Sequence, residues 1–313
     1  MKSLNCPLCL STDYRVNRFF SNPEANIQIC NCNECDHCFT LIESETDSSS
    51  LYSDEVYAIV DNRNSIFDRI QTLEYSKVIR SIDKLLSSVE SHERKMLDFG
   101  SGKGKFLSLA KHGYAVKGIE TSISRANFAR EAYGLDISTD LYISGKINEG
   151  NFSAIVLFHV LEHLPKPTDL LNNLITDNLQ KNGVLVLEVP NISSWQAKLA
   201  GKNWMHLDIP RHLSHFTKEK IFNISEACGL KVVKTSYFSL HLGIIGSLRA
   251  FMGLFGYKSN IIFDLKNFKK HGLSKRVGLL ISVGLIIPIA TLIELVACAF
   301  KSGGIVRVYC MKD

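Results

Sequence analysis

Residues 95–238 alternate short apolar runs with amphipathic stretches, and this alternation limits the fold more than any other feature of the chain. Four runs rich in Val, Ile and Leu are typical of strands: KMLDFG, AVKGIE, SAIVLFH and GVLVLEVP. The stretches between and after them are typical of helices, each with Gly at or near its end: GKFLSLAKHG, SRANFAREAYG, PTDLLNNLITDNLQKNG and TKEKIFNISEACG. Strands that alternate with helices are joined by crossovers and lie parallel. We therefore expect an α/β fold built on a parallel sheet.

Composition divides the chain into five regions. Residues 1–43 hold six of the nine cysteines, and residues 44–94 open with an acidic, Ser-rich linker that leads into a helical pattern. The alternating core follows at 95–238. Residues 239–303 are apolar and basic, with eight Lys or Arg against two Asp or Glu, and residues 304–313 contain the strand-like run GIVRVYCM. Because no signal peptide precedes the first cysteines, we expect a cytoplasmic protein whose cysteines bind metal rather than form disulfides.

The first predicted strand runs into the turn Asp98 to Gly104, which reads D-x-G-x-G-x-G. Glycines allow a sharp turn and a close ligand, and the next helix offers unpaired N–H groups. Lys105 stands where the dinucleotide fingerprint has its third Gly or Ala. The second strand ends at Glu120, where a carboxylate can accept hydrogen bonds from a ribose diol. A solvent-facing carboxylate is the alternative for Glu120, and the neighbouring glycine turn favours the ligand.

These stretches resemble a known family. LDFGSGKGKFL, GIETS, AIVLFHVLEHLPKP and NGVLVLEVPN stand in the order and spacing of class I S-adenosylmethionine-dependent methyltransferases. HVLEHL and DIPRHLSHFT are similar to the methyltransferase-23-like branch, whose relatives act in polysaccharide, lipid and quinone biosynthesis, and the N-terminal CPLC…CNEC module and the GGIVRVYCMK strand also occur there. The resemblance implies a Rossmann-like seven-stranded sheet of order 3-2-1-4-5-7-6. Strand 7 would be antiparallel, and residues 239–303 would form a helical insertion before it.

The same resemblance implies which residues bind the methyl donor. Gly100 to Gly104 would contact its methionine part and ribose, and Glu120 would take the ribose hydroxyls. The cofactor-binding set is Asp98, Gly100, Ser101, Gly102, Gly104, Glu120, Thr121 and His159. Asp140 would approach the adenine. One position departs from the family: strand 4 opens with Phe152-Ser153 where the family has Phe-Asp. That acid supports the start of the sheet rather than the chemistry.

Five of the ten histidines fall in two short stretches that follow predicted strands 4 and 5. HVLEHL lies at the carboxyl end of the sheet, where open α/β sheets bind ligands. The second stretch is a polar, aromatic loop that holds Trp204, His206, Asp208, Arg211, His212 and His215. The catalytic candidates are His159, Glu162, His163 and His212.

Three roles stay open for this cluster. An imidazole, of His163 or His212, would accept a proton from the acceptor. Some relatives carry E-x-x-E-H at this place and bind a divalent metal, but here His159 replaces the first Glu, which would favour an ion softer than magnesium. Alternatively, Glu162 and His163 brace the loop and helix without taking part in the chemistry.

The N-terminal cysteines form two C-x-x-C pairs, and four thiolates complete a tetrahedral structural zinc site. The predicted ligands are Cys6, Cys9, Cys32 and Cys35. Cys35-x-x-Cys38 is an alternative second pair, and His37 is an alternative ligand. The family pattern favours the first choice, because it places an apolar residue at Cys38. Residues 1–43 hold only three basic residues, so we expect no nucleic-acid partner.

The predicted function is methyl transfer from S-adenosylmethionine to a small-molecule or glycan acceptor. A sugar or sugar-nucleotide intermediate of cell-surface polysaccharide synthesis is implied by the resemblance alone. One alternative is methylation of a lipid or quinone ring, and a non-enzyme alternative is a zinc-ribbon binding module on a degenerate fold. The intact glycines and Glu120 argue against degeneracy.

Residues 277–300 are apolar enough to suggest a membrane span, but residues 305–311 must return to the sheet. We therefore expect residues 239–303 to form two helices that lie on the inner face of a membrane. A homodimer interface or a cap over the active site are the alternatives.

Overall fold

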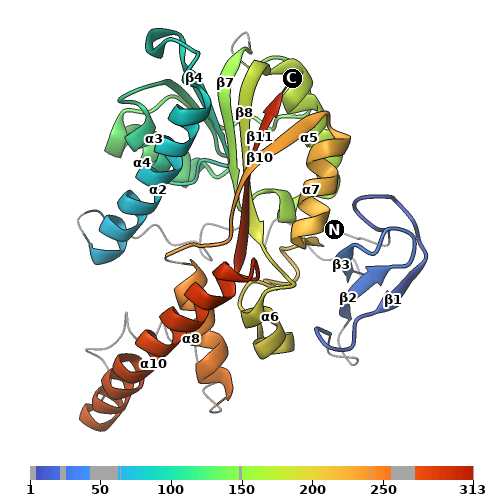
Figure 1. Ribbon diagram of the computed structural model, residues 1–313, viewed down its shortest axis with the longest axis vertical. Coiled ribbons are helices and arrows are strands. Elements are labelled where there is room, and N and C mark those ends of the chain that lie inside the picture. Colours follow the sequence, from blue (N-terminus) through green and yellow to red (C-terminus); the bar gives the residue numbers. More distant parts are fainter. Residues whose placement is uncertain are drawn as a thin grey trace.

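The computed structural model describes residues 5–21, 26–42, 63, 65–147, 150–240, 242–254 and 272–312. Its centre is a seven-stranded sheet in the order β10-β11-β8-β7-β4-β5-β6 (Figure 1). The strands are β4 (Lys95–Phe99), β5 (Ala115–Ile119), β6 (Ile137–Ser138), β7 (Phe152–Phe158), β8 (Leu179–Pro190), β10 (Leu230–Ser236) and β11 (Ile305–Lys312). β11 is antiparallel to both of its neighbours, whereas the other observed pairs are parallel. This is the predicted order 3-2-1-4-5-7-6, so the expected fold class is confirmed.

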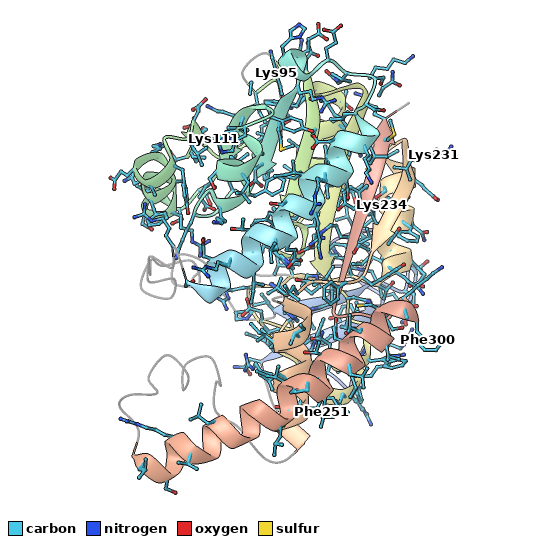
Figure 2. All side chains as sticks on the ribbon, turned by 60° about the vertical axis from the view of Figure 1, so that its left-hand side comes forward. Lys95, Lys111, Lys231, Lys234, Phe251 and Phe300 are labelled. Atoms are coloured by element: carbon cyan, nitrogen blue, oxygen red, sulfur yellow. The ribbon has the colours of Figure 1, made fainter. Side chains whose placement is uncertain are left out.

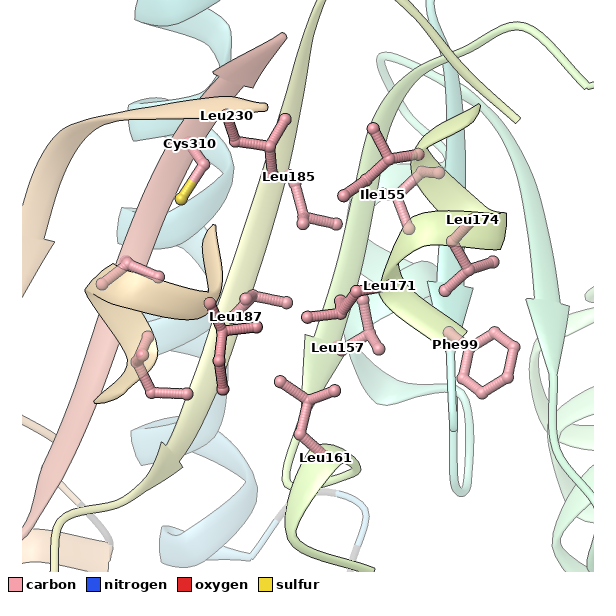
Figure 3. Packing of buried hydrophobic residues seen from close by; sticks show 14 of the residues in the cluster. Phe99, Ile155, Leu157, Leu161, Leu171, Leu174, Leu185, Leu187, Leu230 and Cys310 are labelled. Carbon is pink, nitrogen blue, oxygen red and sulfur yellow. The ribbon is translucent and has the colours of Figure 1, made fainter. Parts of the chain in front are cut away.

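Side chains alternate across the sheet with the two-residue period of a strand, which produces two separate cores. Ala154 and Val156 of β7 face one core, and Ile155 and Leu157 face the other. The first face is covered by α2 (Ile66–Leu85), α3 (Lys105–Ala110) and α4 (Ile123–Tyr133), and the second by α5 (Pro167–Asp177) and α7 (Lys218–Ala227) (Figures 1 and 3). Both faces are therefore apolar, which explains why the central strands read as continuous apolar runs rather than alternating ones.

One predicted boundary is wrong. The pattern predicted a helix from Pro167 to Gly183, but α5 ends at Asp177 and β8 begins at Leu179. Asn178, which is buried, separates the two elements: its carbonyl accepts from Phe152 N, and its side chain binds Ile147 N and Gly145 O. These tertiary hydrogen bonds override the helical propensity of the following residues.

Ser153 explains how the sheet tolerates its departure from the family. Its hydroxyl accepts a hydrogen bond from Lys95 N at 2.9 Å and donates one to Lys95 O at 2.8 Å. The side chain is fully buried. Ser153 therefore ties the start of β7 to the start of β4, which is the structural task expected of the family's Asp.

A second sheet joins the N-terminal module to the core. It has four strands in the order β1-β2-β3-β9, in which β1 (Tyr14–Val16), β2 (Ile27–Cys32) and β3 (Cys38–Ile42) belong to the module. β9 (Ser214–His215) comes from the histidine-rich loop that follows β8. Because β3 pairs with β9, the histidine-rich loop joins the cysteine module to the core.

The predicted insertion before β11 is helical. α8 (Leu242–Leu254) and α10 (Leu273–Ala299) pack together and against α6 (Trp195–Ala200), and they extend away from the seven-stranded sheet (Figures 1 and 2). Three short 3-10 turns complete the described elements: Ser91–Glu93, Leu161–His163 and Gly201–Asn203. Within the described residues, no helix combines the length and apolar character that a membrane crossing requires.

Candidate active site

A cavity of about 380 Å³ opens at the carboxyl ends of β4, β5 and β7. Four of the predicted cofactor residues line it: Gly100, Glu120, Thr121 and His159. The catalytic candidate His163 lines it as well. The remaining predicted cofactor residues, Asp98, Ser101, Gly102 and Gly104, belong to the turn that forms one wall and do not themselves line the cavity.

The glycine turn needs its glycines for two different reasons. Gly104 has a φ of 74°, and a Cβ there would lie 2.8 Å from Ala129 Cβ, so this glycine allows close packing on α4. Gly102 has a φ of 54° with nothing within 4 Å of a Cβ, so the backbone conformation alone requires it. Its N–H donates to Glu120 Oε2 at 2.8 Å. The turn therefore fixes the carboxylate at the end of β5.

Glu120 is held by backbone donors on both of its oxygens. Oε2 accepts from Gly102 N, and Oε1 accepts from Ser122 N at 2.8 Å. Each carboxylate oxygen can accept a further hydrogen bond. The side chain is only 7% exposed yet lines the cavity. Glu120 is therefore oriented to receive hydroxyl donors, as a ribose diol would provide.

Two buried polar atoms beside the cavity have no hydrogen-bond partner among the described residues: Asp98 Oδ1 and Ser101 Oγ. Burial and, to a smaller extent, the charge of Glu120 raise the pKa of Asp98 to about 8. Unsatisfied polar atoms are rare in a finished core. At the cavity wall, the Glu120 carboxylate fits a hydroxyl-bearing ligand, which agrees with S-adenosylmethionine.

Several cavity residues were not predicted. Phe99, Arg125, Val160 and Tyr142 line the cavity, and the rings of Phe99 and Tyr142 meet edge to face at 5.9 Å. Asp140, expected near the adenine, is instead exposed and accepts a hydrogen bond from Ser138 Oγ. Its neighbours Leu141 and Tyr142 line the cavity in its place. Two large apolar residues in an otherwise polar loop were the signal that could have indicated this wall.

His159 is fixed between two buried carboxylates. Its Nε2 lies 2.9 Å from Glu188 Oε1, and its Nδ1 lies 3.3 Å from Glu162 Oε1. Burial alone would lower the pKa of His159, but the two carboxylates outweigh it and raise the pKa to about 10. The ring is therefore a cation at neutral pH with both nitrogens engaged. It suits a fixed positive charge at the cavity wall rather than a general base.

The buried charges continue behind His159. Arg307 of β11 forms ion pairs with Glu188 and with Glu74 of α2, and all three side chains are at most 6% exposed. The pKa of Glu188 is lowered because Arg307 and His159 outweigh the effect of burial. A chain of alternating charges, Glu74–Arg307–Glu188–His159–Glu162, therefore crosses the carboxyl edge of the sheet. The charged residues inside the apolar runs VLEVP and GIVRVYCM were its sequence signal.

Glu162, His163 and His212 form a cluster at this edge. One ligand atom from each lies within 4.8 Å of the others, and the rings of His163 and His212 meet at 4.6 Å. Both carboxylate oxygens of Glu162 are buried without a hydrogen bond of good geometry, and the nearby imidazole of His159 lowers the pKa of Glu162 to about 2 against the effect of burial. The structure thus brings the four catalytic candidates together, because His159 Nδ1 lies 3.3 Å from Glu162 Oε1.

The hydrogen bonds of the two histidines define their neutral tautomers. His212 Nδ1 donates to His206 O at 2.8 Å, and His163 Nδ1 donates to Arg211 O at 3.1 Å. In each neutral ring Nε2 is then the basic nitrogen. Burial lowers the pKa of His212, which keeps this ring neutral. The pair can accept a proton or ligate a metal.

The rest of the histidine-rich loop supports this pair. Arg211 and His212 both face Asp208, and Trp204 is buried in a small cluster with Phe20 and Ile29 of the N-terminal module. His215 Nε2 donates to Thr40 Oγ1 at 2.9 Å, and that hydroxyl donates to His212 O. Strand β3 of the cysteine module therefore backs the segment that carries His212.

The four predicted zinc ligands lie together. The Sγ atoms of Cys6, Cys9, Cys32 and Cys35 are all within 4.8 Å of one another, with Cys6–Cys35 at 3.6 Å and Cys9–Cys32 at 3.4 Å. Tetrahedral zinc with Zn–S bonds of about 2.3 Å needs sulfurs at nearly this spacing. Cys38, the alternative ligand, is buried in β3, and His37 packs against Phe216; neither belongs to the cluster. The donor set fits a structural zinc ion.

The sheet order, the glycine turn and the acidic end of β5 define a class I S-adenosylmethionine-dependent methyltransferase. Comparison with known families identifies the branch: the chain belongs to the methyltransferase-23 family, described as a methyltransferase domain, whose model matches residues 68–235. The chain is therefore an enzyme, and the degenerate-fold alternative is not supported. No curated protein matches the chain.

Solved structures with a similar fold are distant in sequence. A SAM-dependent methyltransferase from Archaeoglobus fulgidus is 16% identical, with a TM-score of 0.48 over 85% of this chain and 100% of its own. The [4+2]-cyclase SpnF is 16% identical, with a TM-score of 0.46 over 75% of this chain and 80% of its own. A SAM-dependent methyltransferase from Thermotoga maritima is 15% identical, with a TM-score of 0.42 over 79% and 98%. The assignment rests on the family match rather than on these likenesses.

Proposed function

We propose that this methyltransferase acts on a hydroxyl of a sugar, sugar-nucleotide or glycan intermediate of cell-surface polysaccharide synthesis. S-adenosylmethionine supplies a methyl group that is already electrophilic. The protein must hold the acceptor and, for a hydroxyl, accept its proton. The observation that carries the proposal is the pair of imidazoles, His163 and His212, beside the cofactor cavity.

Each residue then has a distinct task. Glu120 binds the ribose hydroxyls, and the glycine turn lets the donor approach the backbone. His163 lines the cavity and presents its basic Nε2 to the acceptor, whereas His212 lies behind it, with its Nε2 3.7 Å from Asp208 Oδ2. Glu162 lies within 4.8 Å of this pair and stabilises a positive charge on either ring. The glycan class itself follows from the resemblance of HVLEHL and DIPRHLSHFT to the branch.

The cysteine cluster is proposed as a structural zinc site, held by Cys6, Cys9, Cys32 and Cys35. It lies in the N-terminal module rather than at the cavity, so the zinc would maintain β2 and β3. Because β3 pairs with β9, the ion would also stabilise the loop that carries His212.

A divalent metal at the active site is a second arrangement that the same cluster supports. One carboxylate and two imidazoles, from Glu162, His163 and His212, suit zinc, manganese or iron better than magnesium. Metal analysis distinguishes a metal site from a pair of proton acceptors. A second ion per chain that is lost in His212→Ala would favour the metal site.

A quinone ring is the alternative acceptor.

The test uses labelled S-adenosylmethionine with a panel of sugar nucleotides and quinone precursors. We expect transfer to a sugar hydroxyl. His163→Ala and His212→Ala should lower turnover by roughly 10²–10⁴-fold, the usual contribution of an acid or base group. Donor affinity, measured by calorimetry, should change little. Full turnover in both variants would show that the histidines are structural, and transfer to quinones alone would replace the proposed acceptor.

A further inference from the structure

Exposed apolar side chains gather on one helix. Of the 21 large hydrophobic residues that are exposed in the described part of the chain, ten belong to α10 and the Phe300 that caps it. Leu285 is 66% exposed and Leu292 is 62% exposed. Trp195 of α6, itself 38% exposed, stacks on Phe300 and extends the same surface. A patch of this kind marks an interaction site. We call it the α10 surface.

The α10 surface is held in a fixed orientation by one buried carboxylate. Glu294, 1% exposed, accepts hydrogen bonds from Ser247 Oγ at 2.7 Å, from Gly304 N at 2.8 Å and from Gln196 Nε2 at 3.3 Å. These donors come from α8, from the start of β11 and from α6. The inward stripe of α10 also includes the buried Ala290 and Ala297. The large apolar side chains of α10 therefore lie on its outward face.

Charge identifies the kind of partner. Glu294 is the one acidic residue of α10, and it points inward, so the outward surface of this helix carries no negative charge. The whole segment 239–303 holds eight basic and two acidic residues. An apolar helix within a basic segment complements anionic lipid headgroups. Leu285, Ile287, Ile289 and Leu295 are exposed on this helix.

The insertion is joined to the active site at its first residues. Leu240 N donates to Glu74 Oε2 at 3.1 Å, and Glu74 leads through Arg307 and Glu188 to His159. A surface bound by α10 would therefore lie next to the edge of the sheet where the cofactor cavity opens.

We propose that the α10 surface lies in the headgroup region of an anionic membrane and that the acceptor is a glycan intermediate carried on a lipid. The proposed membrane binding, called the membrane part below, is argued from the α10 surface alone. The proposed lipid-carried acceptor rests on the proposed function. The helix lies in the interface and does not cross it.

Co-sedimentation with vesicles tests the membrane part. The full chain should pellet with vesicles that contain phosphatidylglycerol, less with phosphatidylcholine alone, and less at high salt. Replacing both leucines, in Leu285→Ser with Leu292→Ser, should lower the partition coefficient about tenfold for each leucine. Ile123→Ser is the matched control, because Ile123 on α4 is also 66% exposed but lies away from α10, and it should bind like the wild type.

Two results would overturn the membrane part: a wild-type chain that stays in solution with every vesicle, or a leucine variant that turns a dimer into a monomer while vesicle binding is unchanged. For the acceptor, labelled methyl groups should enter the organic extract of membranes from the organism that carries the gene. Label confined to the aqueous phase would exclude a lipid-carried acceptor. Calorimetry of S-adenosylmethionine without vesicles tests the enzyme separately, so the two failures remain distinguishable.

Discussion

At the residue scale, the cofactor site depends on the different surroundings of two buried acidic residues, Glu120 and Asp98. Glu120 is satisfied by two backbone N–H groups, whereas Asp98 Oδ1 has no hydrogen-bond partner among the described residues. Glu120 is therefore ready to bind a ligand as an anion, whereas the burial of Asp98 costs free energy of folding. The spacing of these two residues was visible in the sequence. The difference between them was not, because it depends on which backbone donors the turn aims at each oxygen.

Glu120→Ala should weaken S-adenosylmethionine binding. The substitution removes hydrogen bonds between a charged group and the ribose, each of which contributes roughly 1.5–3 kcal/mol, so the Kd should rise by at least about tenfold. Isothermal calorimetry measures this directly. Asp140→Ala is the control, because Asp140 is exposed and does not line the cavity. Equal affinity in the wild type and Glu120→Ala would contradict the site.

Asp98→Asn should change the pH dependence of stability. The pKa of Asp98 is about 8 in the folded chain and 3.8 in the reference state, so the folded protein holds a proton that the unfolded chain has already lost. This group therefore lowers the free energy of unfolding progressively as pH rises from about 4 to 8. Asp98→Asn has no carboxyl group at this position, so its free energy of unfolding does not fall with pH for this reason.

Thermal denaturation without cofactor checks the Asp98 prediction. The melting temperature of Asp98→Asn relative to the wild type should increase between pH 4 and 8 and level off above 8. The change of this difference with pH tests the prediction. Its absolute size does not, because the buried amide of Asp98→Asn also needs hydrogen-bond partners. A difference that is constant with pH would show that Asp98 titrates normally.

At the element scale, the cysteine module is more closely tied to the active site than its sequence indicates. β3 pairs with β9, and Thr40 links the module to the backbone of His212. The central strands and most helices could be predicted from their long apolar patterns, and the order of the sheet from the resemblance to the methyltransferase family. β9 and β6 could not, because each has two residues and no periodicity. Their pairing depends on partners distant in sequence.

Replacing Cys32 tests the zinc site. Purified wild-type protein should contain one zinc ion assigned to these cysteines, and Cys32→Ser should lose it, because three thiolates no longer complete the tetrahedron. The melting temperature should fall with it, since β3 supports β9. Cys38→Ala is the control, as Cys38 is buried near the site but outside the cluster. Loss of zinc in Cys38→Ala with retention in Cys32→Ser would move the second pair to Cys35 and Cys38.

At the scale of the whole molecule, two additions to the methyltransferase core, the cysteine module and the helical insertion, meet at one edge of the sheet. The cysteine module reaches this edge through β9, and the helical insertion reaches it through Leu240 and Gly304. The sequence identified both additions by composition, but the contacts that join them to the sheet come from single polar side chains such as Thr40, Glu74 and Glu294. Such residues carry no periodic pattern, so only the assembled fold reveals their partners.

The position of β11 has a consequence for how the enzyme is made. β11 lies between β8 and β10, and β10 has no other neighbour in the sheet among the residues that the structure describes. On the ribosome, β10 therefore emerges long before it can pair, and it waits until residues 305–312 have been synthesised. Long-range pairing of this kind is slow and exposes aggregation-prone intermediates. The nascent chain consequently passes through a stage in which β10 is an unpaired strand.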